Sequence, residues 1–328
     1  MSRCGLLSIC GDPFLLGFFI KLWQERWYDE IDKLYINLNN HTQVPVDIIG
    51  VCLSRLVKDP KVHLIYHPTG IGNGPPQVEN LKLAKEDLVL LLEDDFFIFN
   101  SGAVNRNFKL IEEGKADIIG SCRYATGEVA KTAQKKYNLD YSGLGDKGFG
   151  WWPTGFFCKR ADLLKTDIDF GSKKYPKGKY FKELDHTFIE DAYTDTFTWA
   201  SIQLRYLGFK SIDIPHHHAD PYEIQNKEAG YMNWHKDNQP FDWIHGGSLS
   251  AGWGGYLSDR IPDVSNDSAM QEMESRCAFW IVASDSIEGF NDFKNKYKQG
   301  IQNLIFNANL NQLRIEQKIN IYKTLMKI

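Results

Sequence analysis

The segment Leu88-Val-Leu-Leu-Leu-Glu-Asp-Asp-Phe-Phe-Ile-Phe99 decides the predicted fold. Its first five residues form an uninterrupted apolar run, which is typical of a parallel strand buried on both faces. Three adjacent carboxylates follow at Glu93, Asp94 and Asp95, and a second apolar quartet comes directly after them. The sequence therefore predicts that a buried strand ends in a concentrated negative charge.

A divalent cation would relieve the repulsion among these carboxylates, because the apolar residues on both sides restrict their access to water. In an extended chain Glu93 and Asp95 share one face and Asp94 points to the other. Hard oxygen ligands of this kind suit Mg²⁺ or Mn²⁺, which are commonly held by one or two carboxylates together with substrate phosphates. The alternative is a solvated acidic turn.

Apolar runs alternate with helical patterns between the N-terminus and this segment. We expect strands at residues 4–10, 31–38 and 62–66, and helices at residues 13–27, 46–56 and 77–85. Such alternation predicts an α/β fold with a mainly parallel central sheet flanked by helices. Ligands of such sheets bind beyond the carboxyl ends of the strands. A site is therefore expected in the loops after Cys10, Leu38, Tyr66 and Leu92.

In the second half of the chain, the sequence patterns of strands, helices and polar segments do not alternate regularly. We expect strands at residues 116–121, 156–159 and 209–214, and a polar, mobile segment at residues 134–150. A helix is predicted over residues 187–207, with Thr187 and Glu190 as a capping box and Gly208 as its stop. Two amphipathic stretches, at residues 287–305 and 309–326, predict a C-terminal helical extension.

Composition narrows the classes of function. The 328 residues carry 38 Lys and Arg against 42 Asp and Glu, and this balance argues against a nucleic-acid partner. Six cysteines without a CxxC pair indicate neither a zinc ribbon nor a disulfide scaffold, so a cytoplasmic location is expected. The apolar run at residues 14–20 is too short to span a bilayer, and nothing before it resembles a signal peptide.

Three further features could carry chemistry. Glu190 and Asp191 open the predicted helix; Glu190 is explained by the capping box, whereas Asp191 is not and could act as a general base. The run His216-His-His218 follows a strand end, and His216 or His218 could join the metal, although a polar loop is the alternative. Residues 231–256 interleave aromatic rings with glycines, a composition that suits either sugar binding or a core.

With these motifs in order, the sequence resembles the nucleotide-sugar-dependent glycosyltransferases of the GT-A fold, in particular the broad family 2-like group, over roughly residues 4–220. The segment ending in Glu93-Asp94-Asp95 resembles the DxD motif, with Glu93 in place of the first Asp. Glu190-Asp191 resembles the ED motif. Asn37 stands where family members often carry an Asp.

The resemblance implies a role for each candidate residue. The donor nucleotide sugar, with a UDP-sugar favoured, is expected to contact Cys10, Gly11, Asp12, Asn37, Gly74, Glu93 and Asp94. Asp95 is implied as a ligand of Mn²⁺ or Mg²⁺, joined by His216 or His218. Asp191 is implied as the general base of an inverting transfer. The glycan acceptor is expected to contact Trp151, Trp152, Glu190 and Trp253.

The predicted function is therefore metal-dependent, inverting transfer of a sugar to an acceptor hydroxyl. The donor-binding half is expected at residues 1–120, the acceptor-binding half of the same domain at residues 121–262, and the helical extension at residues 263–328. Three other classes stay open: a sugar nucleotidyltransferase, which lacks its basic glycine-rich loop here; a glycosidase; and a non-catalytic carbohydrate-binding protein, which leaves the three carboxylates unexplained. The C-terminal cations Arg314, Lys318, Lys323 and Lys327 could touch a membrane surface, or their helix could pack on the catalytic domain.

Overall fold

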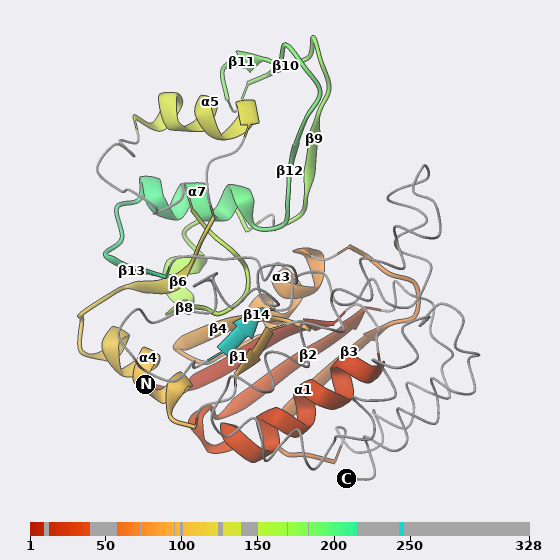
Figure 1. The fold of residues 1–328 in the computed structure, drawn as a ribbon, viewed down its shortest axis with the longest axis vertical. Coiled ribbons are helices and arrows are strands. Elements are labelled where there is room, and N and C mark those ends of the chain that lie inside the picture. Colours follow the sequence, from red (N-terminus) through yellow and green to blue (C-terminus); the bar gives the residue numbers. More distant parts are fainter. Residues whose placement is uncertain are drawn as a thin grey trace, which may run out of the picture.

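The computed structural model describes residues 1–9, 13–39, 58–72, 74–94, 96–98, 101–123, 127–138, 150–168, 170–182, 184–214 and 243–245. Its centre is one sheet with the strand order β13-β6-β8-β4-β1-β2-β3 (Figure 1). The strands are β1 (Arg3–Ile9), β2 (Lys33–Asn39), β3 (Val62–His67), β4 (Leu88–Glu93), β6 (Ile118–Arg123), β8 (Phe156–Lys159) and β13 (Ser211–Ile214), and the short β7 (Gly150–Trp151) pairs with β6.

Most neighbouring strands in this sheet are parallel. The strands β3, β2, β1 and β4 run in one direction, and β13 is parallel to β6. The exceptions are β8, which lies antiparallel between β4 and β6, and the short β7, which is antiparallel to β6. The predicted α/β fold with a mainly parallel sheet is confirmed.

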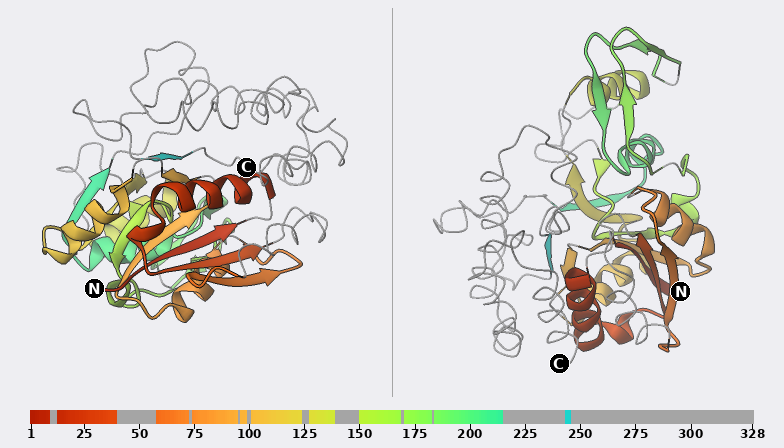
Figure 2. Two further views of the ribbon diagram at one scale, coloured as in Figure 1. Left: turned by 90° about the horizontal axis from the view of Figure 1, so that it is seen from below. Right: turned by 90° about the vertical axis from the view of Figure 1, so that its right-hand side faces the viewer.

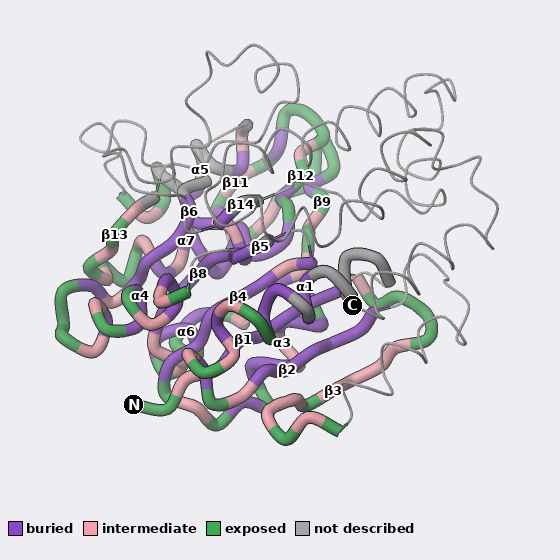
Figure 3. The backbone as a smooth tube through the Cα atoms, turned by 60° about the horizontal axis from the view of Figure 1, so that its bottom comes forward, coloured by how far each residue is buried: buried purple, intermediate pink, exposed green. Residues whose placement is uncertain are grey.

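Helices cover both faces of the sheet. The helices α1 (Pro13–Arg26) and α4 (Ala103–Glu112) pack on the face that carries Leu7, Ile36 and Leu90, and Figure 2 shows α1 lying along the sheet. The helix α3 (Gly74–Leu83) packs on the opposite face. Buried residues follow the central strands (Figure 3). Burial on both faces is the reason that β4 begins with an uninterrupted apolar run and that most residues of β1 and β2 are apolar.

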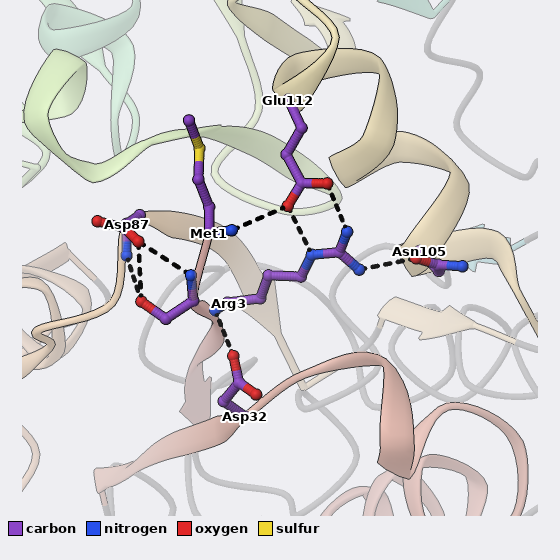
Figure 4. Close-up of polar contacts among 7 residues, drawn as sticks. Met1, Arg3, Asp32, Asp87, Asn105 and Glu112 are labelled. Atoms are coloured by element: carbon purple, nitrogen blue, oxygen red, sulfur yellow. Dashed lines mark hydrogen bonds and ion pairs between the residues drawn. The ribbon is translucent and has the colours of Figure 1, made fainter.

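The N-terminus ties the amino ends of the strands together (Figure 4). The Arg3 guanidinium donates to both carboxylate oxygens of Glu112 and to Asn105 Oδ1, at distances of 2.7–3.1 Å. The Arg3 amide donates to Asp32, and the Ser2 amide to Asp87. These bonds fix α4 and two neighbouring loops to β1 at the end of the sheet opposite to the carboxyl ends.

A second part of the molecule stands away from the sheet (Figure 1). It consists of residues 127–138 and 170–197, called here the projecting part. Its elements are α5 (Gly127–Tyr137), β9 (Lys173–Tyr175), β10 (Tyr180–Phe181), β11 (His186–Thr187) and β12 (Ala192–Thr194), with α7 (Thr198–Tyr206) at its base. The pairs β9–β12 and β10–β11 are antiparallel. A small core holds the part together, made of Val129, Ala133, Tyr175, Leu184, Phe188, Trp199 and Ile202.

The prediction of a helix over residues 187–207 is wrong for its first half. Residues 192–194 form β12, and α7 begins only at Thr198. Tyr193 shares one face of the predicted helix with Ala200 and Leu204, yet 51% of its surface is exposed. The threonines at positions 194 and 196, before α7, favour extended backbone, because their branched side chains lose rotamer freedom in a helix. The predicted stop is confirmed: Gly208 has φ +75° and follows Leu207, the C-cap of α7.

The polar segment predicted at residues 134–150 is also corrected in part. Residues 134–137 complete α5, where Val129 and Ala133 lie one turn apart and face the small core. The predicted helix at residues 46–56 and the C-terminal extension, residues 263–328, lie outside the described residues.

Part of the aromatic segment belongs to the core. The strand β14 (Trp243–His245) pairs antiparallel with β5 (Phe96–Ile98). Trp243 is fully buried, and its ring centroid lies 5.8 Å from that of Phe96 and 6.2 Å from that of Phe157. Trp243 is therefore part of the hydrophobic core. Among the described helices, none has the length and apolar character that crossing a membrane requires.

Candidate functional site

Three polar side chains lie abreast at the carboxyl ends of the central strands. Ser8 on β1 is in register with Asn37 on β2 and with Glu93 on β4. The preceding row on the same face, Leu6 with Tyr35 and Leu91, is buried core. Side chains in register on adjacent parallel strands share a face, so the apolar face changes to a polar one at a single row. This row, with the residues around it, is called the carboxyl edge below.

Asn37 is fully buried and incompletely hydrogen-bonded. Its Nδ2 donates to Glu79 Oε2 at 2.7 Å and to the Pro76 carbonyl at 3.4 Å, whereas its Oδ1 is buried and has no hydrogen-bond partner among the described residues. A buried acceptor without a partner costs about 1–3 kcal/mol and calls for an explanation such as an unseen ligand or water.

A Glu–His pair stands behind Asn37. His67 Nε2 on β3 lies 2.7 Å from the same Glu79 Oε2 on α3. Burial alone would raise the pKa of Glu79, but hydrogen bonds from His67 and Asn37 and the charge of His67 lower it below its ordinary value. The carboxylate therefore stays ionised, and its acceptor oxygen keeps the Asn37 amide oriented with Nδ2 toward α3.

Amide side chains also connect the loop at residues 70–72 and the helix α3 to the strand ends. Asn39 accepts from the Ile71 amide at 2.6 Å and donates to the Gly72 carbonyl at 2.8 Å. On α3, Gln77 donates to the Leu92 and Pro153 carbonyls, and Asn80 donates to the Leu7 carbonyl. None of these residues is among the sequence predictions, although Gln77, Glu79 and Asn80, three polar side chains in a short helix beside buried strands, are a usable signal.

Gly74 is buried at the first turn of α3. A Cβ atom at this position would lie 2.2 Å from the Phe170 carbonyl oxygen, so the close approach of the two backbones requires glycine. This contact gives Gly74 a packing role. Its predicted contact with a donor stays a prediction.

The acidic segment begins at the carboxyl edge. The Glu93 amide donates to Thr154 Oγ1 at 3.2 Å, and only 4% of the Asp94 surface is exposed. The solvated acidic turn is therefore wrong for Asp94. In the described part of the chain, no three His, Cys, Asp or Glu side chains gather as a metal site. The predicted ligands Asp95, His216 and His218 lie outside that part, as do Cys10, Gly11, Asp12 and Trp253.

Trp151 cannot serve as a sugar platform in this structure, which corrects its predicted contact with the acceptor. The residue is fully buried, its Nε1 donates to Asp213 Oδ1 at 2.7 Å, and the Arg205 guanidinium lies 3.9 Å from its ring centroid. Arg205 Nη2 is also 2.8 Å from Asp213 Oδ2, an ion-pair distance without hydrogen-bond geometry. Trp151 thus joins β7, β13 and α7. Trp152 is half-buried, and its predicted contact stays a prediction.

Glu190 and Asp191 lie in the projecting part, not at a helix start. Both are exposed, and Asp191 Oδ1 accepts from the Lys177 amide at 2.7 Å. The capping role of Glu190 is wrong, because β12 follows it and Glu190 instead lines a cavity beside α5. The structure brings Asn37, Glu93 and Asp94 together at the carboxyl edge and leaves Glu190 and Asp191 in the other part.

The fold and this edge define an α/β protein with a polar site at the carboxyl ends of its parallel strands. The sequence matches no protein-family model and no curated protein. The chain resembles crystal structures of S. aureus TarS, residues 1–349. The complex with UDP-GlcNAc gives a TM-score of 0.42 at 11% identity, covering 100% of this chain and 91% of that one. The complex with UDP gives 0.39 at 14%, covering 100% and 90%. The likeness is one of overall arrangement.

Proposed function

We propose that the protein is a glycosyltransferase that binds a nucleoside-diphosphate sugar at the carboxyl edge. The observation that carries the proposal is the polar row of Ser8, Asn37 and Glu93, which runs into the buried Asp94 at the ends of three parallel strands. Ligands of open α/β sheets bind at such ends. A concentrated acidic segment there suits a phosphate-bearing ligand that arrives with a divalent cation.

Asn37 is the proposed contact for the base. Its Oδ1 is an acceptor without a partner in the part of the chain that the structure describes, and a base N–H is a donor that would satisfy it. Since Asn37 is fully buried, this contact requires the residues that cover Asn37 to move aside. Glu79 keeps the orientation of the amide and is therefore a positioning residue.

In the proposed transfer, the acceptor hydroxyl oxygen bonds to the anomeric carbon while the bond from that carbon to the diphosphate oxygen breaks. The diphosphate leaves with the electron pair, and Asp191 takes the hydroxyl proton, which requires the projecting part and the carboxyl edge to come together around the acceptor. Inversion and the role of Asp191 are predictions from the ED-like motif. Asp95, with Glu93 and Asp94 beside it and His216 or His218, would hold Mn²⁺ or Mg²⁺, which supplies charge neutralisation at the departing diphosphate.

A ligand-binding experiment tests the donor site. UDP-GlcNAc, the ligand of one compared TarS structure, and UDP are added to the full chain with Mn²⁺ or with EDTA, and the thermal unfolding midpoint is measured. Ligand at about a hundred times its dissociation constant stabilises the native state by about 2.7 kcal/mol, so a clear rise is expected with Mn²⁺ and little or none with EDTA.

The variant Asp95→Ala should lose this rise, whereas the matched control Asp167→Ala, an exposed carboxylate outside the carboxyl edge, should keep it. The absence of any shift with UDP-, GDP-, CDP- and dTDP-sugars would contradict a donor site. Binding of a nucleotide sugar without transfer or hydrolysis in Mn²⁺ would favour a non-catalytic protein.

A further inference from the structure

The projecting part contains a cavity of about 670 Å³. One wall is α5 and the other is the hairpin β10–β11 with the loop after it; the lining residues are Glu128, Thr132, Lys135, Lys136, Leu184, Asp185, His186, Ile189 and Glu190. Its volume falls within the range of about 300–1,000 Å³ that is usual for small-molecule sites. No residue of the carboxyl edge lines it, so it is a separate site.

Hydrogen bonds between lining residues connect the two walls of this cavity. Glu128 Oε1 on α5 lies 2.6 Å from His186 Nε2 on β11 and accepts from the Ile189 amide at 3.3 Å. The hydrogen bond from His186 holds the pKa of Glu128 below its ordinary value, which keeps the carboxylate available to both partners. Below the cavity, Leu184 belongs to the small core. The cavity is therefore formed before any ligand arrives.

The chemistry of the lining is mixed in charge. Two ammonium groups, from Lys135 and Lys136, stand against three carboxylates, from Glu128, Asp185 and Glu190, and one of these carboxylates is paired with His186. A lining of both signs offers hydrogen-bond donors and acceptors without a net preference for a cation or an anion. An uncharged ligand with many hydroxyl groups uses such a lining best.

Apolar surface accompanies these polar groups. Ile189 is 71% exposed at the cavity, and Tyr180 is 55% exposed beside it, with its hydroxyl donating to Asp185 Oδ1 at 2.7 Å. A fixed, exposed ring next to hydroxyl-binding groups matches a sugar, whose ring presents apolar C–H faces and polar edges. The two observations point to the same class of ligand.

We infer that this cavity binds a neutral oligosaccharide, as the holding site for a part of the acceptor that does not react. That the ligand is part of the acceptor rests on the proposed function. That the ligand is an oligosaccharide rests on the cavity alone. Contacts to a remote part of a substrate add binding energy that helps to position its reacting end. Glu190 thereby keeps its predicted role toward the acceptor, at a site separate from the donor.

The test measures oligosaccharide binding and donor binding separately on the full chain. Cellohexaose, chitohexaose and maltohexaose are the probes, followed by saturation-transfer NMR and by calorimetry, and UDP-GlcNAc with Mn²⁺ is titrated in parallel. Thr132→Trp places a large side chain in the cavity, and the double variant Lys135→Ala/Glu190→Ala removes one donor and one acceptor from exposed positions. Lys174→Ala, exposed on β9 and absent from the lining, is the matched control.

At least one hexasaccharide should bind the wild type, and both cavity variants should weaken it by about tenfold or more, whereas Lys174→Ala should not. UDP-GlcNAc binding should be the same in all four proteins. Unchanged hexasaccharide binding in either folded cavity variant, or no binding of any probe to the wild type, would overturn the inference. If the hexasaccharides respond as expected while no nucleotide sugar binds, the proposed function fails and the sugar site stands.

Discussion

The carboxyl edge and the projecting part each contain one Glu–His pair of nearly equal length, 2.7 Å for Glu79 and His67 and 2.6 Å for Glu128 and His186. Their surroundings differ. Glu79 also binds the fully buried Asn37 on a central strand, whereas Glu128 also binds the Ile189 amide in an exposed loop. The same pair of groups thus orders the end of a sheet in one place and the wall of a cavity in the other.

This difference suggests a division of roles between the two regions. A pair connected to buried strands can be removed only with a loss of stability, because it leaves a buried polar group without a partner. A pair in a small, exposed unit can be changed with less effect on the whole fold. We expect the carboxyl edge to combine stability and donor binding, and the projecting part to affect acceptor use with little effect on stability.

The largest expected effect is on turnover. It shows whether the projecting part contributes a catalytic residue in addition to binding the acceptor. If Asp191 is the general base, Asp191→Asn should lower turnover by about 10²–10⁴-fold, because an amide cannot take the acceptor proton. UDP-GlcNAc binding by calorimetry should be unchanged. The control is Glu113→Gln, an exposed carboxylate at the end of α4. Retained turnover in Asp191→Asn would remove Asp191 as the base and restrict this part to binding.

The next effect concerns the place where α7 joins the central sheet. Trp151→Ala should lower the free energy of unfolding by about 3–5 kcal/mol, because the variant leaves a cavity between β7 and α7 and removes the partner of Asp213. Urea unfolding followed by circular dichroism measures this loss. The half-buried neighbour offers a matched variant, Trp152→Ala, which should lose less. Equal, small losses in both would show that Trp151 is not a structural residue.

A direct comparison of the two Glu–His pairs should give an intermediate effect. Glu79→Ala removes the acceptor of the buried Asn37 amide and should cost about 1–3 kcal/mol of unfolding free energy. Glu128→Ala should cost clearly less, but it should weaken hexasaccharide binding by releasing His186 and Ile189. A larger loss of stability from Glu128→Ala than from Glu79→Ala would contradict the division of roles.

The smallest expected effect is a dependence of the free energy of unfolding on pH, with the same sign for the Glu–His pairs of both regions. The pKa values of Glu79 and Glu128 are lowered by folding, so each pair stabilises the native state fully above the ordinary pKa of about 4.5, and the contribution is lost as the pH falls through the lowered value. The difference in unfolding free energy between wild type and Glu79→Gln should therefore shrink below pH 4.5. A difference that grows on acidification would contradict the sign.

The carboxyl edge was largely predictable from the sequence. The strands β1, β2 and β4 are buried on both faces, and continuous apolar runs identify such strands. Parallel order then brings Asn37 and Glu93 to one edge. The bond from Asn37 to Glu79 could not be foreseen, because the two residues are 42 positions apart and neither strand nor helix periodicity relates them.

The projecting part was mostly not predictable. Its strands are two or three residues long, which is too short to show an alternation of period two. The segment from Tyr193 to Leu204 also matches a helical period, and the pairing of β12 with β9 overrides that pattern in its first turn. Glu190 was therefore assigned to a helix cap, and only the tertiary structure assigns it to the cavity.

The antiparallel strand β8 has a consequence for how the chain folds during its synthesis. Because β8 fills the position between β4 and β6, β4 lacks its second neighbour until residue 159 has been synthesised, and β6 also waits for β13 at residues 211–214. A nascent chain that ends near residue 120 carries the apolar β4 as an open edge, and unpaired apolar edges recruit strands from other chains. On the ribosome, the N-terminal residues must therefore wait for β8, and a fragment cut between the two halves should aggregate and not fold.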